Sequence, residues 1–227
     1  MEEVTVASAG ARERVPQISI LRPGTQQAAA SILQRSFYER RPDIVARALL
    51  GKLLVSERKG KLLIGRIVEV EAYFGTEDPA AHAYIGRTAR NAVLFGPPGF
   101  AYVYFIYGMY YCLNVSCEPD GHAGCVLIRA LEPVEGLSTM AKLRALPPDP
   151  KPRLLTSGPG RLCQALDITR AAHNGLDVTD PVSCLQIKDD GYQPEHILVT
   201  PRVGIRHAAE RPARFIIDKN KFVSTSR

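Results

Sequence analysis

Hydrophobic and polar residues alternate most regularly across residues 67–74, which read IVEVEAYF. A period of two is typical of a β-strand, because successive side chains of a strand point to opposite faces. One face of the expected strand carries Val68, Val70, Ala72 and Phe74. The other carries Ile67, Glu69, Glu71 and Tyr73. We expect the first face to pack in the core and the second to carry chemistry.

Two carboxylates share the second face. Glu69 and Glu71 occupy positions i and i+2, so they lie roughly 6.5–7 Å apart along the strand and can influence each other's charge. Tyr73 is the next side chain in the same row, and the TEDPAAH stretch after Gly75 brings His82 beside the end of the strand. Acid, ring and imidazole can therefore converge. The alternative is a half-exposed edge strand with a solvated glutamate pair, and periodicity alone favours it.

The segment 100–117, FAYVYFIYGMYYCLNVSC, holds five tyrosines in an apolar, strand-like run that Gly108 interrupts. It predicts a hairpin whose tip is Tyr107, Gly108 and Met109. An ordinary core hairpin would bury such rings. At a tip, however, Tyr107 has no core to fill, and a large apolar side chain beside basic loops is the kind that parts stacked bases.

The length of the hairpin loop decides which side chains share a face. A two-residue loop of Gly108 and Met109 would turn Tyr104 away from Asn114. A three-residue or bulged loop would place these two residues opposite each other on one face, and the sequence leaves both registers open.

Periodicity and turn residues predict the other elements. A helix near residues 44–49 should end at Gly51, and a strand at 53–56 should form a hairpin with the strand above through a turn at 59–61. A strand at 124–131 carries Arg129 among apolar neighbours, which is typical of an arginine that is paired or lies at the rim of a site. A helix is expected at 133–146, Ser157 is expected to cap the helix that follows it, and short strands are expected at 197–200, 214–217 and 222–224.

Length and composition bound the class of protein. The 227 residues are 45% hydrophobic and show no repeat, so we expect one main domain at 36–227 after a weakly ordered tail at 1–35. The formal net charge of +6 suits a polyanionic partner but is also common in ordinary enzymes. The five cysteines are scattered, and we find neither a signal peptide nor an apolar run that could cross a membrane, so we expect a reduced intracellular protein. Cys112 and Cys117 lack the spacing of a zinc site, and no metal is expected.

Five blocks of the sequence, in this order and spacing, closely resemble the alkyladenine (3-methylpurine) DNA glycosylase family: GRIVEVEAYFGTEDPAAHA, AYVYFIYGMYYCLNVS, CVLIRALEPVEGL, SGPGRLCQAL and PRVGIRHA. The resemblance covers roughly residues 36–217. It implies a single α+β domain with a curved antiparallel sheet, short surrounding helices and a protruding hairpin, without metal or cofactor. The implied partner is double-stranded DNA that contains a damaged purine, bound by a monomer away from membranes. The implied location is the cytoplasm or nucleoid of a bacterium, or the nucleus of a eukaryote.

By this resemblance Glu71 is the general base that activates water against the anomeric carbon of the damaged nucleotide. Arg129 would help to position the DNA backbone near that water, and Glu69 becomes a supporting residue. A carboxylate in this place suits the chemistry, because cleavage of a purine glycosidic bond develops positive charge on the sugar. No lysine lies within residues 67–82 to form an imine, so we expect a monofunctional hydrolase that leaves an abasic site.

The resemblance also assigns the residues that recognise the base. Tyr73, His82 and Tyr104 would stack around the flipped purine, and the backbone of His82 would read its edge. Asn114 would exclude normal guanine by crowding its amino group. Tyr107 would fill the gap left in the duplex. The implied substrates are 3-methyladenine, 7-methylguanine, hypoxanthine and ethenoadenine.

Two other hypotheses remain open on the sequence. A non-catalytic module could sense distorted nucleic acid with the same wedge, although a sensor has no evident need for Glu71. A helix-hairpin-helix repair fold could use Gly158, Pro159 and Gly160 to grip a phosphate. Such folds are mostly helical, and the strand-rich stretches near residues 67, 102 and 124 argue against this second alternative.

Overall fold

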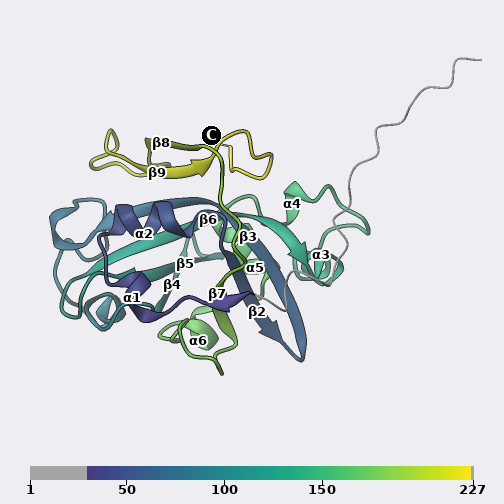
Figure 1. Cartoon of the computed structure of the whole chain (residues 1–227), viewed down its shortest axis with the longest axis horizontal. Helices are drawn as coiled ribbons and strands as arrows, with labels where there is room; N and C mark the ends of the chain where they lie inside the picture. The colour runs from purple at the N-terminus through teal and green to yellow at the C-terminus, as the bar shows by residue number, and fades with distance from the viewer. Residues whose placement is uncertain (1–29, 226–227) are drawn as a thin grey trace, which may run out of the picture.

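The alternating stretch is part of β3 (Lys61–Phe74), which lies in the middle of the molecule (Figure 1). The computed structural model describes residues 30–225, and in it nine strands form one curved, open sheet. β3 pairs with a neighbour on each side, so it is a central strand. The expectation of an α+β fold built on an antiparallel sheet is confirmed.

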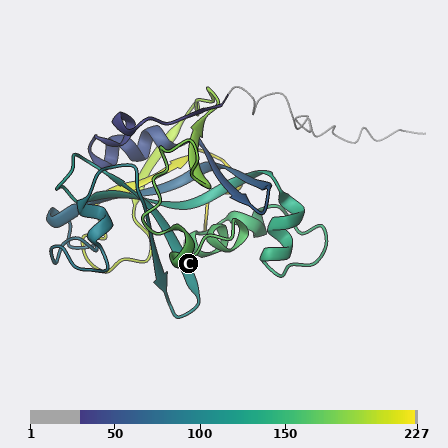
Figure 2. The same cartoon turned by 90° about the horizontal axis from the view of Figure 1, so that it is seen from below.

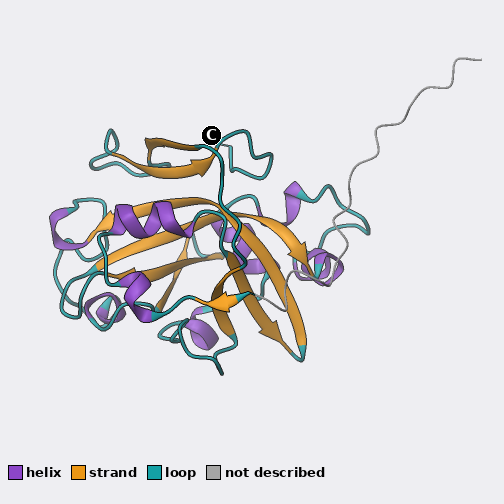
Figure 3. Ribbon diagram, in the orientation of Figure 1, coloured by secondary structure: helices purple, strands orange, loops and turns teal. Residues whose placement is uncertain are grey.

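Strands form the centre of the molecule, and short helices and loops lie around them (Figure 3). The remaining strands are β1 (Ser31–Ile32), β2 (Leu53–Arg58), β4 (Ala101–Ile106), β5 (Tyr110–Cys117), β6 (Gly124–Glu135), β7 (Leu185–Asp189), β8 (Ile197–Pro201) and β9 (Pro212–Ile217). The helices are α1 (Arg35–Tyr38), α2 (Pro42–Leu49), α3 (Leu137–Leu143), α4 (Arg153–Thr156), α5 (Pro159–Ala165) and α6 (Arg170–His173), with single 3-10 turns η2 (Gly75–Glu77) and η3 (Ala92–Phe95). Along the sheet the order is β1-β7-β2-β3-β6-β5-β4, and β9 pairs with both β3 and β8.

Both faces of β3 are buried. Val68, Val70 and Ala72 lie in the main core as expected. Glu69 and Glu71 on the other face have 0% exposed surface. The edge-strand alternative, with its solvated glutamate pair, is therefore wrong. Because a buried carboxylate is costly unless it is paired or hydrogen-bonded, these two side chains need specific partners.

Local turn chemistry places β3 as the sequence predicts. Gly51 has a φ of +89°, a left-handed conformation that ends α2 before β2 begins. β2 and β3 pair from Arg58 and Lys61 outward, so their loop is only Lys59 and Gly60, both with positive φ. Such a two-residue loop matches the natural twist of a hairpin. The expected turn at 59–61 and the hairpin are confirmed.

The helix predicted at 133–146 begins later in the structure, at Leu137. β6 continues to Glu135, and α3 starts at Leu137 after Gly136, whose φ is +82°. Pro133 fits in the strand because it lies opposite Gly65, beside a register shift where the ladder is interrupted.

Two further predictions, for Ser157 and for residues 222–224, also differ from the structure. Ser157 does not cap the following helix: Gly158 is the residue before α5, and the Ser157 hydroxyl donates instead to the carbonyl of Val223 at 3.4 Å. Residues 222–224 form no strand, although Phe222 is buried. Their backbone groups serve side chains of other elements, which periodicity does not reveal.

The described chain joins the sheet shortly before residue 36, since Ser31 and Ile32 of β1 pair with β7. Residues 1–29, most of the expected tail, lie outside the described residues. In the part of the chain that the structure describes, no helix has the length and apolar character needed to cross a membrane.

Candidate active site

The tyrosine-rich hairpin has a three-residue loop. Ile106 pairs with Tyr110, which leaves Tyr107, Gly108 and Met109 at the tip, as the sequence predicts. The N–H of Met109 donates to the carbonyl of Ile106 at 3.3 Å, and both residues between them have positive φ. The φ of Tyr107 is +54°, a conformation that costs a non-glycine residue about 1–2 kcal/mol. The hairpin protrudes from the molecule (Figure 2), and Tyr107 is 77% exposed.

This loop length settles the register. Tyr104 and Asn114 lie on the same face of the hairpin, as the three-residue alternative requires. They are not directly opposite each other, however. Asn114 is opposite Tyr102, and Tyr104 is opposite Cys112.

The side chains singled out by the sequence surround one cavity of about 420 Å³. Tyr73, His82, Tyr104 and Asn114 line it, and so does Tyr107 at the hairpin tip. A cavity of this volume with mixed aromatic and polar walls is typical of a small-molecule site. The structure thus brings together residues from β3, the loop after it and both strands of the hairpin.

The His82 wall is fixed by its neighbours. His82 Nδ1 hydrogen-bonds the Tyr102 hydroxyl at 2.9 Å, and its ring meets Tyr104 edge-on with centroids 4.5 Å apart. The side-chain amide of Asn91 donates to the carbonyl of His82 at 2.9 Å, which holds the backbone of the loop. Burial, and then the nearby charge of Arg90, lower the pKa of His82 below its usual value. His82 is therefore neutral at pH 7.

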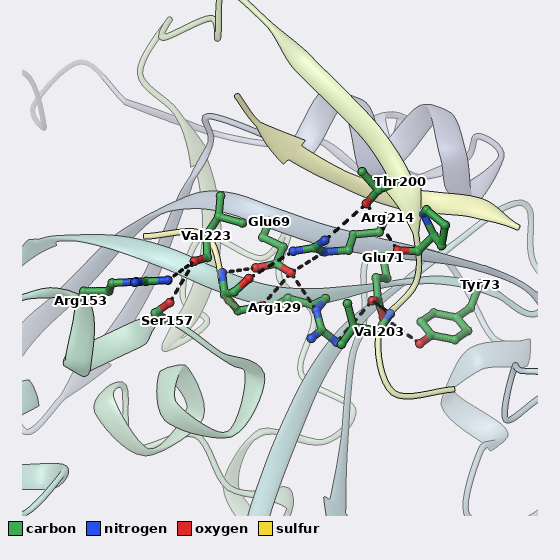
Figure 4. Close-up of polar contacts among 12 residues, drawn as sticks. Glu69, Glu71, Tyr73, Arg129, Arg153, Ser157, Thr200, Val203, Arg214 and Val223 are labelled. Carbon is green, nitrogen blue, oxygen red and sulfur yellow. Dashed lines mark hydrogen bonds and ion pairs between the residues drawn. The ribbon is translucent and has the colours of Figure 1, made fainter. Parts of the chain in front are cut away.

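Figure 4 shows Glu71 beside Tyr73, Val203 and Arg129, all of which line the cavity, whereas Glu71 itself does not. Its Oε1 accepts a hydrogen bond from the N–H of Val203 at 2.7 Å and lies 3.3 Å from the NH1 of Arg129. Its Oε2 accepts from the Tyr73 hydroxyl at 2.9 Å. Tyr73, Arg129 and Val203 themselves line the cavity. Only one layer of residues therefore separates the Glu71 carboxylate from the cavity.

Burial and the carboxylate of Glu71 set the protonation states of two neighbours, Tyr73 and Arg129. Burial, followed by the charge and hydrogen bond of Glu71, raises the pKa of Tyr73 far above its usual value, so Tyr73 remains a donor. Burial alone would lower the pKa of Arg129, but the carboxylates of Glu71 and Glu69 raise it. Arg129 is therefore a permanent cation beside the Glu71 carboxylate.

Glu69 differs from Glu71 in its surroundings. Its Oε1 accepts from Arg129 Nε at 3.0 Å, Arg214 Nε at 2.7 Å and the Ser224 hydroxyl at 2.9 Å. Its Oε2 accepts from the N–H of Ser224 at 2.6 Å. Four donors occupy Glu69, and it does not line the cavity. The geometry agrees with a supporting role for Glu69, with Glu71 as the carboxylate nearer to the cavity.

Sequence reasoning missed several residues that build the site. They are Tyr102 and Asn91 behind His82, Val203 beside Glu71, and Arg214 and Ser224 around Glu69. The block PRVGIRHA contained Val203, but a backbone N–H leaves no mark in a sequence pattern. Among the described residues, no three His, Cys, Asp or Glu side chains are placed to hold a metal ion.

The sequence of this chain was compared with family models and with known proteins, and it matches both. The family model described as Methylpurine-DNA glycosylase (MPG) matches residues 36–221. A protein of Koribacter versatilis (strain Ellin345) is 53% identical over 205 residues, which cover 90% of this chain and 99% of the relative. Proteins of Alkaliphilus oremlandii and Carboxydothermus hydrogenoformans are 47% and 49% identical, and each match covers 85% of this chain and 98% of the relative. All three relatives are named, provisionally, 3-methyladenine DNA glycosylase.

Proposed function

The chain belongs to the methylpurine-DNA glycosylase family, and from this premise we propose that it flips alkylated or deaminated purines out of duplex DNA and hydrolyses their glycosidic bond with water activated by Glu71. The observation that carries the proposal is that Tyr73, His82, Tyr104 and Asn114 line one cavity, with Glu71 behind its wall. The substrates are 3-methyladenine, 7-methylguanine, hypoxanthine and ethenoadenine. The protein works as a monomer without metal or cofactor.

The reaction exchanges one bond to the sugar for another. The bond between C1′ and the purine nitrogen breaks, and its electron pair leaves with the base. The oxygen of water bonds to C1′, and Glu71 accepts the proton that this water gives up. The carboxylate also stabilises the positive charge that develops on the sugar, in a site shielded from bulk water. Arg129 helps to position the DNA backbone near this water.

The walls of the cavity suit a flipped purine. Tyr73, His82 and Tyr104 offer aromatic faces, which hold an extruded base by stacking and favour a base that carries positive charge. The neutral state of His82 adds no repulsion against such a cation. Asn114 is nearly fully buried, and its amide is held by the carbonyl of Tyr102 at 3.3 Å, so it presents a fixed obstacle to the amino group of guanine.

A direct assay tests the function. Duplexes that carry one hypoxanthine or one ethenoadenine are incubated with excess protein, and free base and strand breaks are measured separately. We expect release of the free base and an intact strand that breaks only after alkaline treatment, since the proposed product is an abasic site. Saturating protein that binds the lesion but never releases base would instead favour a non-catalytic binding module. Strand cutting without alkali would contradict the monofunctional mechanism.

Tyr107→Ser tests the wedge. A tyrosine that is 77% exposed at a hairpin tip can replace the extruded nucleotide in the stack, and this contact matters only where a base must leave a pair. We expect the variant to lose about tenfold or more in affinity for a paired lesion, corresponding to the 1–3 kcal/mol of one stacking contact. An unpaired lesion should be bound almost as well as by the parent.

The matched control for the wedge is Tyr192→Ser, which removes an exposed tyrosine that lies against Arg66. This control should bind both duplexes like the parent. Equal losses of Tyr107→Ser on paired and unpaired lesions would count against a wedge.

The helix-hairpin-helix alternative does not fit the fold. Gly158 precedes α5, a helix of seven residues that begins at Pro159, in a molecule built on a nine-stranded sheet. Pro159 and Gly160 line the cavity instead of forming part of a helical hairpin.

A further inference from the structure

Four residues from distant parts of the chain form a buried charge cluster next to Glu71. We call Glu69, Arg129, Arg214 and Ser224 the Glu69 cluster. Figure 4 shows Glu69 between Arg214 and Arg129, with Glu71 on the far side of Arg129. Glu69 has 0% exposed surface, and the side chains of Arg129 and Arg214 are each 9% exposed. A charge network this deeply buried must be satisfied by protein groups and not by bulk water.

We propose that Ser224, through Glu69, is a positioning residue for the reaction: it completes the donors around Glu69, so that Glu69 holds Arg129 in place and keeps it from pairing fully with Glu71. The inference rests on the proposed role of Glu71 as general base. Ser224 reaches neither the cavity nor Glu71, so it acts only through Glu69 and Arg129.

Glu69 and Glu71 compete for the guanidinium of Arg129. Its Nε donates to Glu69 at 3.0 Å, whereas its NH1 is 3.3 Å from Glu71. A guanidinium forms its strongest contact with a carboxylate in a bidentate pair. If Glu69 released Nε, Arg129 could turn both nitrogens to Glu71. A Glu71 oxygen engaged in this way would accept a proton from water less readily.

Ser224 helps to fix Glu69 in the orientation that this arrangement needs. Its N–H donates to Oε2 at 2.6 Å, and its hydroxyl donates to Oε1 at 2.9 Å. One residue therefore contacts both oxygens of the carboxylate. Without the hydroxyl, Oε1 would depend on the two arginines alone, and only the N–H of Ser224 at Oε2 would still fix the orientation of the carboxylate.

The segment that carries Ser224 is docked by separate contacts. The carbonyl of Val223 accepts from Arg153 at 3.1 Å and from the Ser157 hydroxyl at 3.4 Å, and Phe222 is buried. The carbonyl of Ser224 accepts from Arg214 at 3.2 Å. Loss of one side-chain hydroxyl should therefore leave the segment in place, and docking can be tested apart from the contact with Glu69.

The experiment compares four variants, together with Glu71→Gln, in single-turnover excision of hypoxanthine from a duplex, and both the maximal rate and the half-saturating protein concentration are measured. Ser224→Ala removes the hydroxyl, Ser224→Thr retains it, and Glu69→Gln removes the charge that holds Arg129. Ser157→Ala is the matched control, because it removes a hydroxyl that contacts the same segment but not Glu69. Thermal unfolding of each variant identifies a temperature at which all are folded.

We expect Ser224→Ala to lower the maximal rate about tenfold and Glu69→Gln about a hundredfold, the scale of one and of several lost hydrogen bonds to a charged group. The half-saturating protein concentration should stay unchanged in both variants. Ser224→Thr and Ser157→Ala should retain the maximal rate of the parent. A purely structural role would instead lower the rates of Ser224→Ala and Ser157→Ala together.

Failure of this inference is distinguishable from failure of the proposed function. Parent-like maximal rates for Ser224→Ala and Glu69→Gln, with Glu71→Gln inactive, would overturn the positioning role alone. A parent-like rate for Glu71→Gln would overturn both. Equal losses in Ser224→Ala and Ser157→Ala would also overturn it, since docking of the segment would then explain the effect.

Discussion

Replacing Glu71 with glutamine is expected to slow single-turnover release of hypoxanthine from duplex DNA by about 10²- to 10⁴-fold, the usual contribution of a general base. Glutamine has nearly the shape of glutamate, and its amide oxygen can still accept from the Tyr73 hydroxyl or from the N–H of Val203. It cannot take a proton from water at neutral pH. Binding of the lesion should stay within about threefold of the parent, because Glu71 lies behind the wall and does not line the cavity.

The control for this variant is Glu118→Gln, which neutralises a partly buried glutamate beside Gly124, outside the cavity. It should release base at the parent rate. Excision by Glu71→Gln at a rate comparable to that of Glu118→Gln would remove Glu71 from its proposed role. Loss of both binding and release would instead indicate that the glutamine disturbs the pocket.

The sequence predicts those parts of the site that depend on local geometry. Alternation along β3 places Glu71 and Tyr73 in one row, and the structure joins them with a hydrogen bond. Gly108 marks the hairpin tip, and the tip places Tyr107 in solvent. In both cases a short stretch of chain determines which way the side chains point, so its pattern of residues is sufficient.

The loop length and its register could not be decided in this way. The choice depends on Tyr107 adopting a positive φ, which a non-glycine residue rarely does. The sheet sets one part independently: β5 also pairs with β6, where Asn114 lies opposite Leu127, so the face of Asn114 does not depend on the turn. The alignment of β4 with β5 is the part that the turn residues left open.

The contacts around Glu69 were also beyond sequence reasoning. Arg214 is 145 residues and Ser224 is 155 residues away from Glu69 along the chain. Residues 222–224 resemble a strand in composition, yet the N–H of Ser224 donates to a buried carboxylate instead of to a neighbouring strand. The need of a buried charge for donors predicts that such contacts exist, but it does not say which residues provide them.

A second buried ion pair beside the cavity is expected to have the largest effect on stability. Arg202 and Asp78 both have fully buried side chains, and Arg202 NH2 donates to Asp78 Oδ1 at 2.9 Å while NH1 donates to Oδ2. Asp78 also accepts from the N–H of Phe74 and of Ala80. The guanidinium of Arg202 lies 4.7 Å from the ring centre of Tyr73. Arg202 directly precedes Val203 in the chain. The pair thus joins the end of β3 to the segment that carries the donor to Glu71.

Asp78→Ala is therefore expected to lower the free energy of unfolding by about 3–5 kcal/mol, because it leaves the buried charge of Arg202 without its partner. The double variant Asp78→Leu with Arg202→Met removes both charges and should recover most of that loss, since apolar residues of similar size often replace a buried pair without cost. Urea unfolding at pH 7 measures both effects. A loss below about 1 kcal/mol for Asp78→Ala would mean that water reaches Arg202 and that the ion pair stabilises the fold no more than a surface pair does.

The dependence of this stabilisation on pH follows from Asp78. Burial alone would raise its pKa, but the hydrogen bonds from Arg202, Ala80 and Phe74 lower it below the value of a free aspartate, which is about 3.9. A carboxyl whose pKa is lower in the folded state contributes stability that is full above the unfolded pKa and is lost as pH falls through the folded one. Between pH 7 and pH 5 the pair should contribute a constant amount, and below about pH 4 the parent should lose stability faster than the double variant. Parallel acid-unfolding curves for the parent and the double variant would show that Asp78 has the same pKa in the folded and the unfolded protein, and the ion pair would then contribute no pH-dependent stability.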